Sequence, residues 1–386
     1  MSKSKTTTIK EYYTKNGKKQ YMFKIYLGID PLTGNPKSTT RRFKTLPEAK
    51  RALTQMKFEI QNGTYHRQQV ETYQEVYDLW IKQYERNVEE STFVKTTGIF
   101  RNHILPAVGN YRITKMNFSV CQKHVNEWAN KLKKARIVKS YASKVLDFAI
   151  KIGYIQTNPF ALVEVPSSSK STQYGDESKK SYTKEQLITF LQCMKQESNT
   201  KAYTLFHLLA YSGMRKSEAL ALTWKDIDFN INEIRINKAL GRGKENKLYI
   251  KPTKTGNPRT IKIDSTTTSI LKEWKKQQRQ NHLILGYNTM QSNQLVFSNM
   301  KNEFLQPTVT NKWLKSVLTK YKLSDITTHG FRHTHCSLLL EANVRLKEVS
   351  DRLGHRDAHT TLNVYAHVSE QAKSDTVNKF EMFMAM

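Results

Sequence analysis

Apolar and polar residues alternate through the first part of the chain in the pattern of short β-strands. The segments IKEYYTK, QYMFKIYLG and STTRRF have this alternation, and NGKK and PLTGNP between them are rich in turn-forming residues. LPEAKRALTQMKFEIQNG then changes to helical spacing and reaches Gly63, a residue suited to end a helix. The pattern predicts a three-stranded sheet followed by one helix within residues 1–65.

Between residues 72 and 165 the apolar positions recur at i, i+3 and i+4, which is typical of amphipathic helices. Four such segments follow one another, and we expect GYIQTNPF to end this helical region, with Pro159 as a stop. The stretch 166–181, PSSSKSTQYGDESKKS, is rich in serine and lysine and has the composition of a linker. An all-helical domain over 72–165 is therefore predicted.

The third region, 182–386, begins with TKEQ, in which Thr183 and Gln186 form a capping-box pattern. Helical segments surround the strand-like EIRIN, KLYIKP and RTIKI, and the TGNP turn suggests a hairpin between the last two. The fold class predicted is multidomain α+β: a sheet with one helix, an all-α domain, and a mostly α domain with a small antiparallel sheet.

The composition indicates which class of partner the protein binds. The chain has 386 residues, of which 38% are hydrophobic, and a net charge of +30. Such a charge favours nucleic acid as the partner, with an anionic membrane surface as the alternative. No apolar run approaches 18 residues and no signal peptide is evident. Three widely spaced cysteines without C-x-x-C argue against disulfides or a zinc ribbon and suggest a reducing cytoplasm.

The basic excess is strong in the first domain. Small sheets can lie on DNA, and an ordinary solvated sheet face is the alternative interpretation. The candidate DNA contacts near its strands are Lys18, Lys19, Lys24, Arg41 and Arg42.

The segment THGFRHTHC, residues 328–336, concentrates candidate chemistry. His329 and His333 have the spacing of a zinc-binding pair, but Gly330 stands where H-E-x-x-H has glutamate. Arg332 and His329 share a helix face, and a cap at Thr327 or Thr328 places them in a first turn, where free N–H groups favour an anion. We favour the anion site, with His333 and His335 in packing or in solvent.

Two further cations belong to this hypothesis. In YSGMRKSEAL, Gly213 ends a helix and Arg215 stands at the start of the next, with Glu218 placed to orient it or to cap that helix. Lys254 lies at the tip of KPTKTGNPRTI, where a mobile turn could bring it to a phosphate. Lys251 and Lys262 are alternatives to Lys254.

LGHRDAHTTLNVYAHV supplies the last candidates, His355 and Tyr365. A helix-turn-helix is the alternative explanation of this segment. A tyrosine hydroxyl has a pKa of about 10, and neighbouring cations would stabilise the phenolate for attack on phosphorus.

Read together, Arg215, Lys254, His329, Arg332, His355 and Tyr365 resemble the tyrosine recombinase family, in its phage and integrative-element integrase branch. The resemblance implies an arm-type DNA-binding domain at 1–65, a helical, SAM-like core-binding domain at 72–165, a linker at 166–181 and a catalytic domain with a tail helix at 182–386. It implies an integrase that integrates and excises a mobile element or prophage through a 3′-phosphotyrosine at Tyr365.

The same resemblance implies the other roles. Arg215 and Arg332 would hold the phosphate, Lys254 would protonate the leaving oxygen, His329 would act as acid or base, and His355 would hydrogen-bond the phosphate. No metal and no cofactor are expected. The expected partners are core-type and arm-type sites on double-stranded DNA, three further copies in a tetramer, an excisionase and a host DNA-bending protein, with no membrane, in the bacterial cytoplasm at the nucleoid.

The tail after Tyr365 carries an apolar stripe that packs on its own domain or, as the resemblance suggests, docks on a neighbouring subunit; its members are Val377, Phe380 and Met384. Two other protein classes stay open at this stage. One is a DNA-binding regulator without cleavage activity, and the other is a metal-dependent nuclease. A resolvase-like role is less favoured because of residues 1–65.

Overall fold

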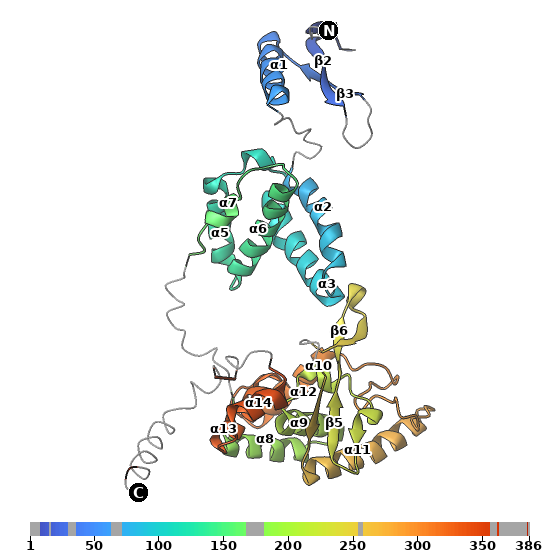
Figure 1. Cartoon of the computed structure of the whole chain (residues 1–386). Helices are drawn as coiled ribbons and strands as arrows, with labels where there is room; N and C mark the ends of the chain where they lie inside the picture. The colour runs from blue at the N-terminus through green and yellow to red at the C-terminus, as the bar shows by residue number, and fades with distance from the viewer. Residues whose placement is uncertain are drawn as a thin grey trace. The chain divides into compact units, whose positions relative to one another are not determined.

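The computed structural model describes residues 8–14, 17–29, 36–62, 72–166, 181–253, 258–355, 361–362 and 384. The chain divides into two compact units, one formed by Met1–Gln83 and Ile99–Val165 and the other by Tyr84–Gly98 and Pro166–Met386. Figure 1 shows the elements of each unit along the chain. Among the described residues, no helix has the length and apolar composition needed to span a lipid bilayer.

The N-terminal elements of the first unit confirm the predicted sheet and helix. Strands β1 (Lys10–Tyr13), β2 (Lys19–Ile29) and β3 (Pro36–Phe43) pair antiparallel in that order, and α1 (Leu46–Gln61) follows. Phe23 and Ile25 of β2 pack with Met56 of α1 in a small core. Asn62 occupies the cap position of α1, and Gly63, the expected cap, lies outside the described residues.

Helices dominate residues 72–165, as predicted, but Tyr84–Gly98 of this range group with the second unit. The other elements of the range are α2 (Tyr73–Arg86), a π-helical turn (Phe100–Ile104), α4 (Leu105–Val108), a 3₁₀ turn (Ile113–Lys115), α5 (Phe118–Lys131), α6 (Ala135–Lys151) and α7 (Pro159–Leu162). Pro159 begins α7, so it does not act as the expected helix stop. The Asn158 side chain accepts from the Phe160 N–H and thereby caps α7, and proline at the first helical position loses no hydrogen bond.

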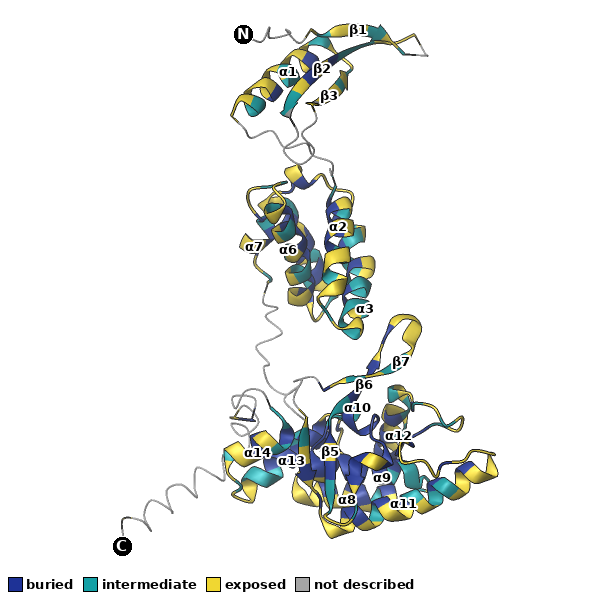
Figure 2. Ribbon diagram, turned by 45° about the vertical axis from the view of Figure 1, so that its right-hand side comes forward, coloured by how far each residue is buried: buried dark blue, intermediate teal, exposed yellow. Residues whose placement is uncertain are grey.

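The second unit contains α3 (Glu90–Ile99) and a larger set of elements after residue 181. Its helices are α8 (Lys184–Gln196), α9 (Thr200–Ser212), α10 (Lys216–Ala219), α11 (Ser265–Ile284), α12 (Pro307–Lys320), α13 (Gly330–Glu341) and α14 (Leu346–Leu353). Both hydrogen bonds of the predicted capping box at Thr183 and Gln186 are present. Helix α9 is buried along nearly all of its length and forms the centre of the core, as Figure 2 shows. Phe206 of α9 packs ring against ring with Phe190 of α8 and Phe331 of α13.

The strands of this unit form two separate ladders. Strands β4 (Ile227–Asp228), β5 (Glu233–Ile236) and β8 (Arg259–Lys262) make one sheet, and β6 (Lys238–Arg242) pairs with β7 (Leu248–Pro252) in the other. The hairpin expected between KLYIKP and RTIKI is therefore wrong: β7 pairs with β6, and β8 pairs with β5. The turn composition of TGNP is satisfied by any tight connection, and it does not specify which strands pair across it.

Candidate active site

Arg215 is positioned by an abrupt change of direction between α9 and α10. Helix α9 ends at Gly213, which adopts a left-handed φ of 64° and donates its N–H to Leu209 O. A Cβ on Gly213 would lie 2.5 Å from Leu353 Cδ2 and 2.6 Å from His335 Cδ2, so both conformation and space require glycine. The chain then begins α10 directly after Arg215, as the sequence predicts.

Glu218 holds Arg215 at two points. Its carboxylate accepts from the Arg215 backbone N–H and from Nη1, each at 2.9 Å. Both roles expected of Glu218, orienting the arginine and capping the helix, are thus present together. The carboxylate also accepts from Arg259 Nη2 at 2.7 Å, although Glu218 is only 1% exposed. Burial alone would raise the pKa of Glu218, but Arg259 and Arg215 bring it below its ordinary value.

Arg332 lies in the first turn of α13, as predicted, and is 3% exposed. Its Nη1 donates to Gly213 O at 2.9 Å and its Nη2 to Leu353 O at 2.6 Å. These carbonyls end α9 and α14, where a cation satisfies unpaired acceptors and the negative end of the helix dipole. Burial, with the charge of Arg215, lowers the pKa of Arg332 to about 9, so the guanidinium remains charged at neutral pH.

His355 follows directly on α14. Gly354, with φ 66°, caps that helix, and His355 Nδ1 lies 2.7 Å from Thr361 Oγ1. Burial lowers the pKa of His355 to about 4, and the charges of Arg332 and Arg215 contribute to the shift. The structure thus gathers Arg215, Arg332 and His355 within one electrostatic neighbourhood, and the imidazole is neutral at pH 7.

His329 occupies the N-cap position of α13 and is exposed, and its ring centroid lies 4.8 Å from that of His333. The threonine expected to cap the helix contributes from two residues further back, since Thr327 Oγ1 accepts from the Gly330 N–H at 3.0 Å. His333 is half-buried against His329.

His335 supports the site from behind. Its Nδ1 lies 2.8 Å from Ala210 O, and Arg352 Nε donates to its Nε2 at 3.0 Å. Because arginine can only donate, the histidine is neutral and carries its proton on Nδ1. Burial lowers the pKa of His335 to about 4. The packing role expected for this histidine therefore includes two specific hydrogen bonds.

Two arginines of this network, Arg259 and Arg352, were not among the sequence candidates. Arg259 Nε donates to Arg352 O at 3.0 Å, and Arg352 donates to Lys262 O and Tyr211 O. The residue pattern gave no sign of their roles, because each depends on which carbonyls the tertiary fold brings near.

The remaining catalytic candidates, Lys254 and Tyr365, lie outside the described residues. So do Val377 and Phe380 of the tail stripe, whereas Met384 is described and is 67% exposed. Of the alternative lysines, Lys251 Nζ donates to Ser91 Oγ at 2.8 Å, and Lys262 is exposed at the end of β8.

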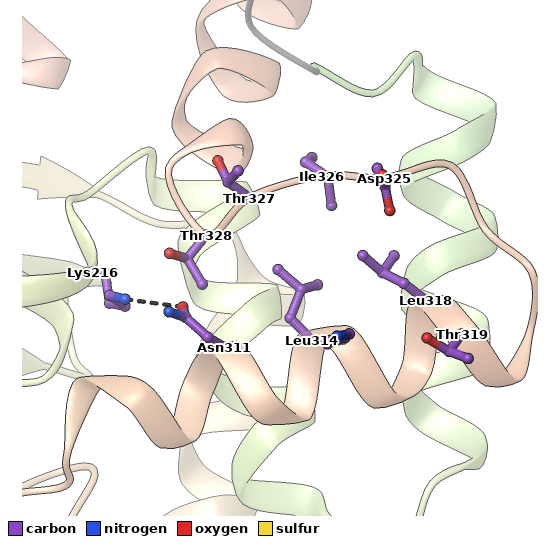
Figure 3. A pocket seen from close by; sticks show the side chains of 10 residues that line it. Lys216, Asn311, Leu314, Leu318, Thr319, Asp325, Ile326, Thr327 and Thr328 are labelled. Carbon is purple, nitrogen blue, oxygen red and sulfur yellow. Dashed lines mark hydrogen bonds between the residues drawn. The ribbon is translucent and has the colours of Figure 1, made fainter. Parts of the chain in front are cut away.

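A pocket of about 490 Å³ opens beside the candidate site, between α12 and the residues that precede α13 (Figure 3). Thr327 and Thr328 line it, next to His329. Lys216, the neighbour of Arg215, also lines it and donates to Asn311 Oδ1 at 3.1 Å. Burial, and then the charge of Arg242, lowers the pKa of Lys216.

The five basic candidates of the N-terminal sheet do not share one face. Phe23 pairs with Arg41, so Arg41 belongs to the face that packs on α1, whereas Lys24 pairs with Thr40 and alternates to the opposite face. Arg42 is on the side of Lys24 and lies 5.9 Å from the Tyr12 ring centroid. Lys18 is exposed before β2, and Lys19 forms an ion pair of 2.8 Å with Glu11.

Family comparisons match three segments of the chain. Residues 180–372, half of its length, match the phage integrase family. Residues 72–129 match the N-terminal SAM-like domain of phage integrases, and residues 11–60 match an arm DNA-binding domain.

Curated relatives resemble nearly the whole chain. A tyrosine recombinase XerC-like protein of Caldanaerobacter subterraneus subsp. tengcongensis is 26% identical, over 95% of this chain and 97% of its own length. The ICEBs1 integrase of Bacillus subtilis is 23% identical, over 94% and 97% respectively.

Solved structures share the fold. A Tn1549 transposon integrase in complex with transposon right-end DNA has a TM-score of 0.67 and 22% identity, covering 80% of this chain and 99% of that one. A lambda integrase tetramer bound to a Holliday junction has a TM-score of 0.54 and 17% identity, covering 90% of this chain and 96% of that one.

Proposed function

The chain belongs to the phage integrase family, and we propose that it is a site-specific DNA recombinase that integrates and excises a mobile element or prophage. The observation that carries the proposal is the convergence of two arginines on the C-terminal end of α9. Arg332 binds the carbonyl of Gly213, and Arg215, two residues later, is fixed by Glu218. Guanidinium groups held in this way can bind the oxygens of one phosphate without reorganising.

In the proposed reaction the Tyr365 hydroxyl oxygen attacks the scissile phosphorus. The bond from phosphorus to the 5′-oxygen breaks, a 3′-phosphotyrosine forms, and the 5′-oxygen leaves as a hydroxyl after taking up a proton. Arg215 and Arg332 hold the non-bridging oxygens as charge builds on the pentavalent state. Loss of either donor is expected to cost about 2.7–4 kcal/mol of transition-state stabilisation.

The other proposed roles concern protons and positioning. Lys254 delivers the proton to the leaving 5′-oxygen, and His329 removes the proton of the tyrosine hydroxyl. His355 hydrogen-bonds the phosphate in its neutral form. The phosphotyrosine conserves the energy of the phosphodiester, so a second 5′-hydroxyl can attack it and rejoin DNA with neither ATP nor a cofactor or metal ion.

The proposal assigns a task to each region. Residues 1–65 bind arm-type sites, residues 72–165 bind core-type sites, 166–181 is a linker, and 182–386 carries out catalysis. Four copies act together on paired sites, with an excisionase and a host DNA-bending protein setting direction and geometry. The work takes place at the host nucleoid in the bacterial cytoplasm, where the target DNA lies.

A nicked core-site duplex that traps the covalent intermediate tests the function. We expect a protein–DNA adduct that survives SDS, forms in EDTA and is absent from Tyr365→Phe. A regulator without cleavage activity forms no adduct with either protein, and a metal-dependent nuclease loses cleavage in EDTA. Adduct formation by Tyr365→Phe at the wild-type rate would refute the assignment of the nucleophile.

A further inference from the structure

Helix α11 carries four cations on one face. Lys272, Lys275, Lys276 and Arg279 are spaced i, i+3, i+4 and i+7, which places all four side chains along a single stripe. Like charges three or four residues apart destabilise a helix that has no counterion. The stripe therefore has an electrostatic cost that an anionic ligand would relieve.

The stripe borders a hollow of about 370 Å³. Its lining consists of the four cations together with Phe229 and Gln280, so no acidic side chain lines it. The Nζ atoms of Lys272 and Lys275 lie 5.7 and 5.2 Å from the Phe229 ring centroid. The aromatic ring is thus already covered by ammonium groups, and the surface that the hollow offers is cationic.

Arg279 gives an independent sign of a ligand. Its Nε atom is buried and has no hydrogen-bond partner among the described residues. A buried N–H without an acceptor costs free energy, and a turn of the Arg279 side chain, which lines the hollow, would bring that N–H to an oxygen of a bound ligand. Burial, reinforced by the charge of Arg279, also lowers the pKa of the adjacent Lys275.

The hollow is separate from the candidate active site. In both Figure 1 and Figure 2, α11 runs along a different edge of the second unit from α10, which begins after Arg215. None of the residues that line the hollow belongs to the network of Glu218, Arg332 and His355. A ligand bound here does not compete for the scissile phosphate.

We infer that this hollow binds backbone phosphates of a DNA duplex other than the one held at the active site. Three lysines act as point charges, and the arginine adds a directed pair of donors, a combination that suits phosphodiester oxygens and reads no sequence. An acidic protein segment is the less favoured occupant, because the only apolar side chain in the lining is the covered ring of Phe229. The inference rests on the proposed function only in assuming that a first duplex occupies the active site.

The experiment compares the full chain with Lys272→Gln/Lys275→Gln/Lys276→Gln/Arg279→Gln. The control removes four exposed lysines elsewhere in the second unit: Lys184→Gln/Lys195→Gln/Lys301→Gln/Lys322→Gln. The probe is a random-sequence 20-bp duplex, and its affinity is measured against salt concentration. Affinity falls as the salt concentration rises, and each phosphate contact adds about 0.9 to the magnitude of the slope of log affinity against log salt.

We expect the stripe variant to lose about two to four from this slope and the control to lose less than one. Both variants should form the core-site adduct at the wild-type rate. An unchanged slope in the stripe variant, or an equal loss in the control, overturns the inference. So does a poly-glutamate peptide that competes with the duplex as well as unlabelled DNA does, because the occupant would then be an acidic protein segment.

Two further results distinguish a failure of the inference from a failure of the proposed function and from misfolding of the variant. Failure of wild-type protein to form any adduct counts against the proposed function alone, because the slope test needs no cleavage. Where the quadruple variant does not fold, the pair Lys272→Gln/Lys276→Gln, both exposed, should lose about half as much slope, and no change in the pair overturns the inference.

Discussion

Glu218 is the counterion of Arg215 and Arg259, and because it is buried it depends on both of them to remain charged. A carboxylate that is 1% exposed is stable in its charged form only when its donors stay in place. Arg215 was identifiable from sequence because it follows a glycine helix stop and precedes a glutamate by three residues. Arg259 was not, because its partner is 41 residues away in the chain and is reached only through the fold.

Replacing Arg259 should make the position of Arg215 less fixed, although Arg259 is not among the residues proposed to bind DNA. Arg259→Gln removes a buried charge partner of Glu218, and we expect a loss on the order of 3 kcal/mol in the free energy of unfolding. Adduct formation should also slow, since Glu218 no longer holds Arg215 as firmly. Urea denaturation and the rate of adduct formation measure the two effects.

Controls for this variant come from the same sheet. Arg235→Gln alters an exposed arginine on the adjacent strand β5 and should change neither quantity. Arg259→Lys retains the charge and should recover part of the rate. Effects of Arg259→Gln and Glu218→Gln that are strictly additive in the double variant would contradict the coupling of these two side chains.

The buried histidines make stability depend on pH. Burial lowers the pKa of His335 to about 4, and the pKa of His355 is likewise about 4. Below the ordinary histidine pKa of about 6.5, the unfolded chain takes up protons that the folded chain does not. Stability should therefore be fully present above pH 6.5 and fall as the pH decreases toward 4.

His335→Gln tests this attribution. The variant takes up one proton fewer on unfolding, so its denaturation midpoint should depend less steeply on pH between 6.5 and 4 than that of the wild type. Thermal denaturation at half-unit steps of pH provides the comparison. A variant with the wild-type pH slope would assign the dependence to other groups.

At the scale of elements, the hydrophobic pattern predicted whether a segment is a helix or a strand better than it predicted which segments pair with each other. The three strands and the helix within residues 1–65 follow directly from alternation and periodicity, and the capping box of α8 follows from the TKEQ motif. The pairing of β7 and β8 was mispredicted because a turn sequence fixes local geometry, whereas pairing depends on registers between distant segments. Pro159 was misassigned because proline both ends helices and begins them, and only the cap by Asn158 decides which.

The junction of α9 and α10 gives a test at this scale. Gly213→Ala imposes a left-handed conformation on a residue with a Cβ, at about 1–2 kcal/mol, and forces that Cβ against Leu353 and His335. Gly286→Ala has a similar φ of 79° with nothing within 4 Å, so it reports the backbone cost alone.

Urea denaturation should show a larger loss for Gly213→Ala than for Gly286→Ala, by more than about 1 kcal/mol, because overpacking adds to the strain. Adduct formation should fall only in the first variant, since Gly213 O binds Arg332. Equal losses of stability in the two variants would mean that the junction is less tightly packed than the structure indicates.

For the whole molecule, the net charge and the order of the predicted regions indicate DNA as the partner. Net charge predicts the class of partner because long-range attraction depends on the sum of charges. It does not predict which face binds, since that depends on strand register and packing. The sheet illustrates this limit: Lys24 and Arg42 share the face opposite α1, whereas Arg41 is on the other side.

Deletion of residues 1–65 should separate two kinds of DNA binding. The sheet and α1 have their own small core of Phe23, Ile25 and Met56, so we expect the helices between residues 72 and 165 to keep their packing without them. Electrophoretic binding assays should show weakened affinity for arm-type duplexes and unchanged affinity for core-type duplexes. Equal loss on both duplexes would contradict the proposed division of labour.

A pair of substitutions narrows the same test to one face of the sheet. Lys24→Ala/Arg42→Ala removes two of the positive charges from the face opposite α1, where Lys10 also lies, and leaves the apolar core intact, so it should weaken arm-site binding by a large part of the effect of the deletion. Lys50→Ala/Lys57→Ala removes the same charge from the exposed surface of α1. If that control weakened arm-site binding to the same extent, the helix and the sheet would contribute alike through charge alone, and the exposed strand face would not be the surface that lies on DNA.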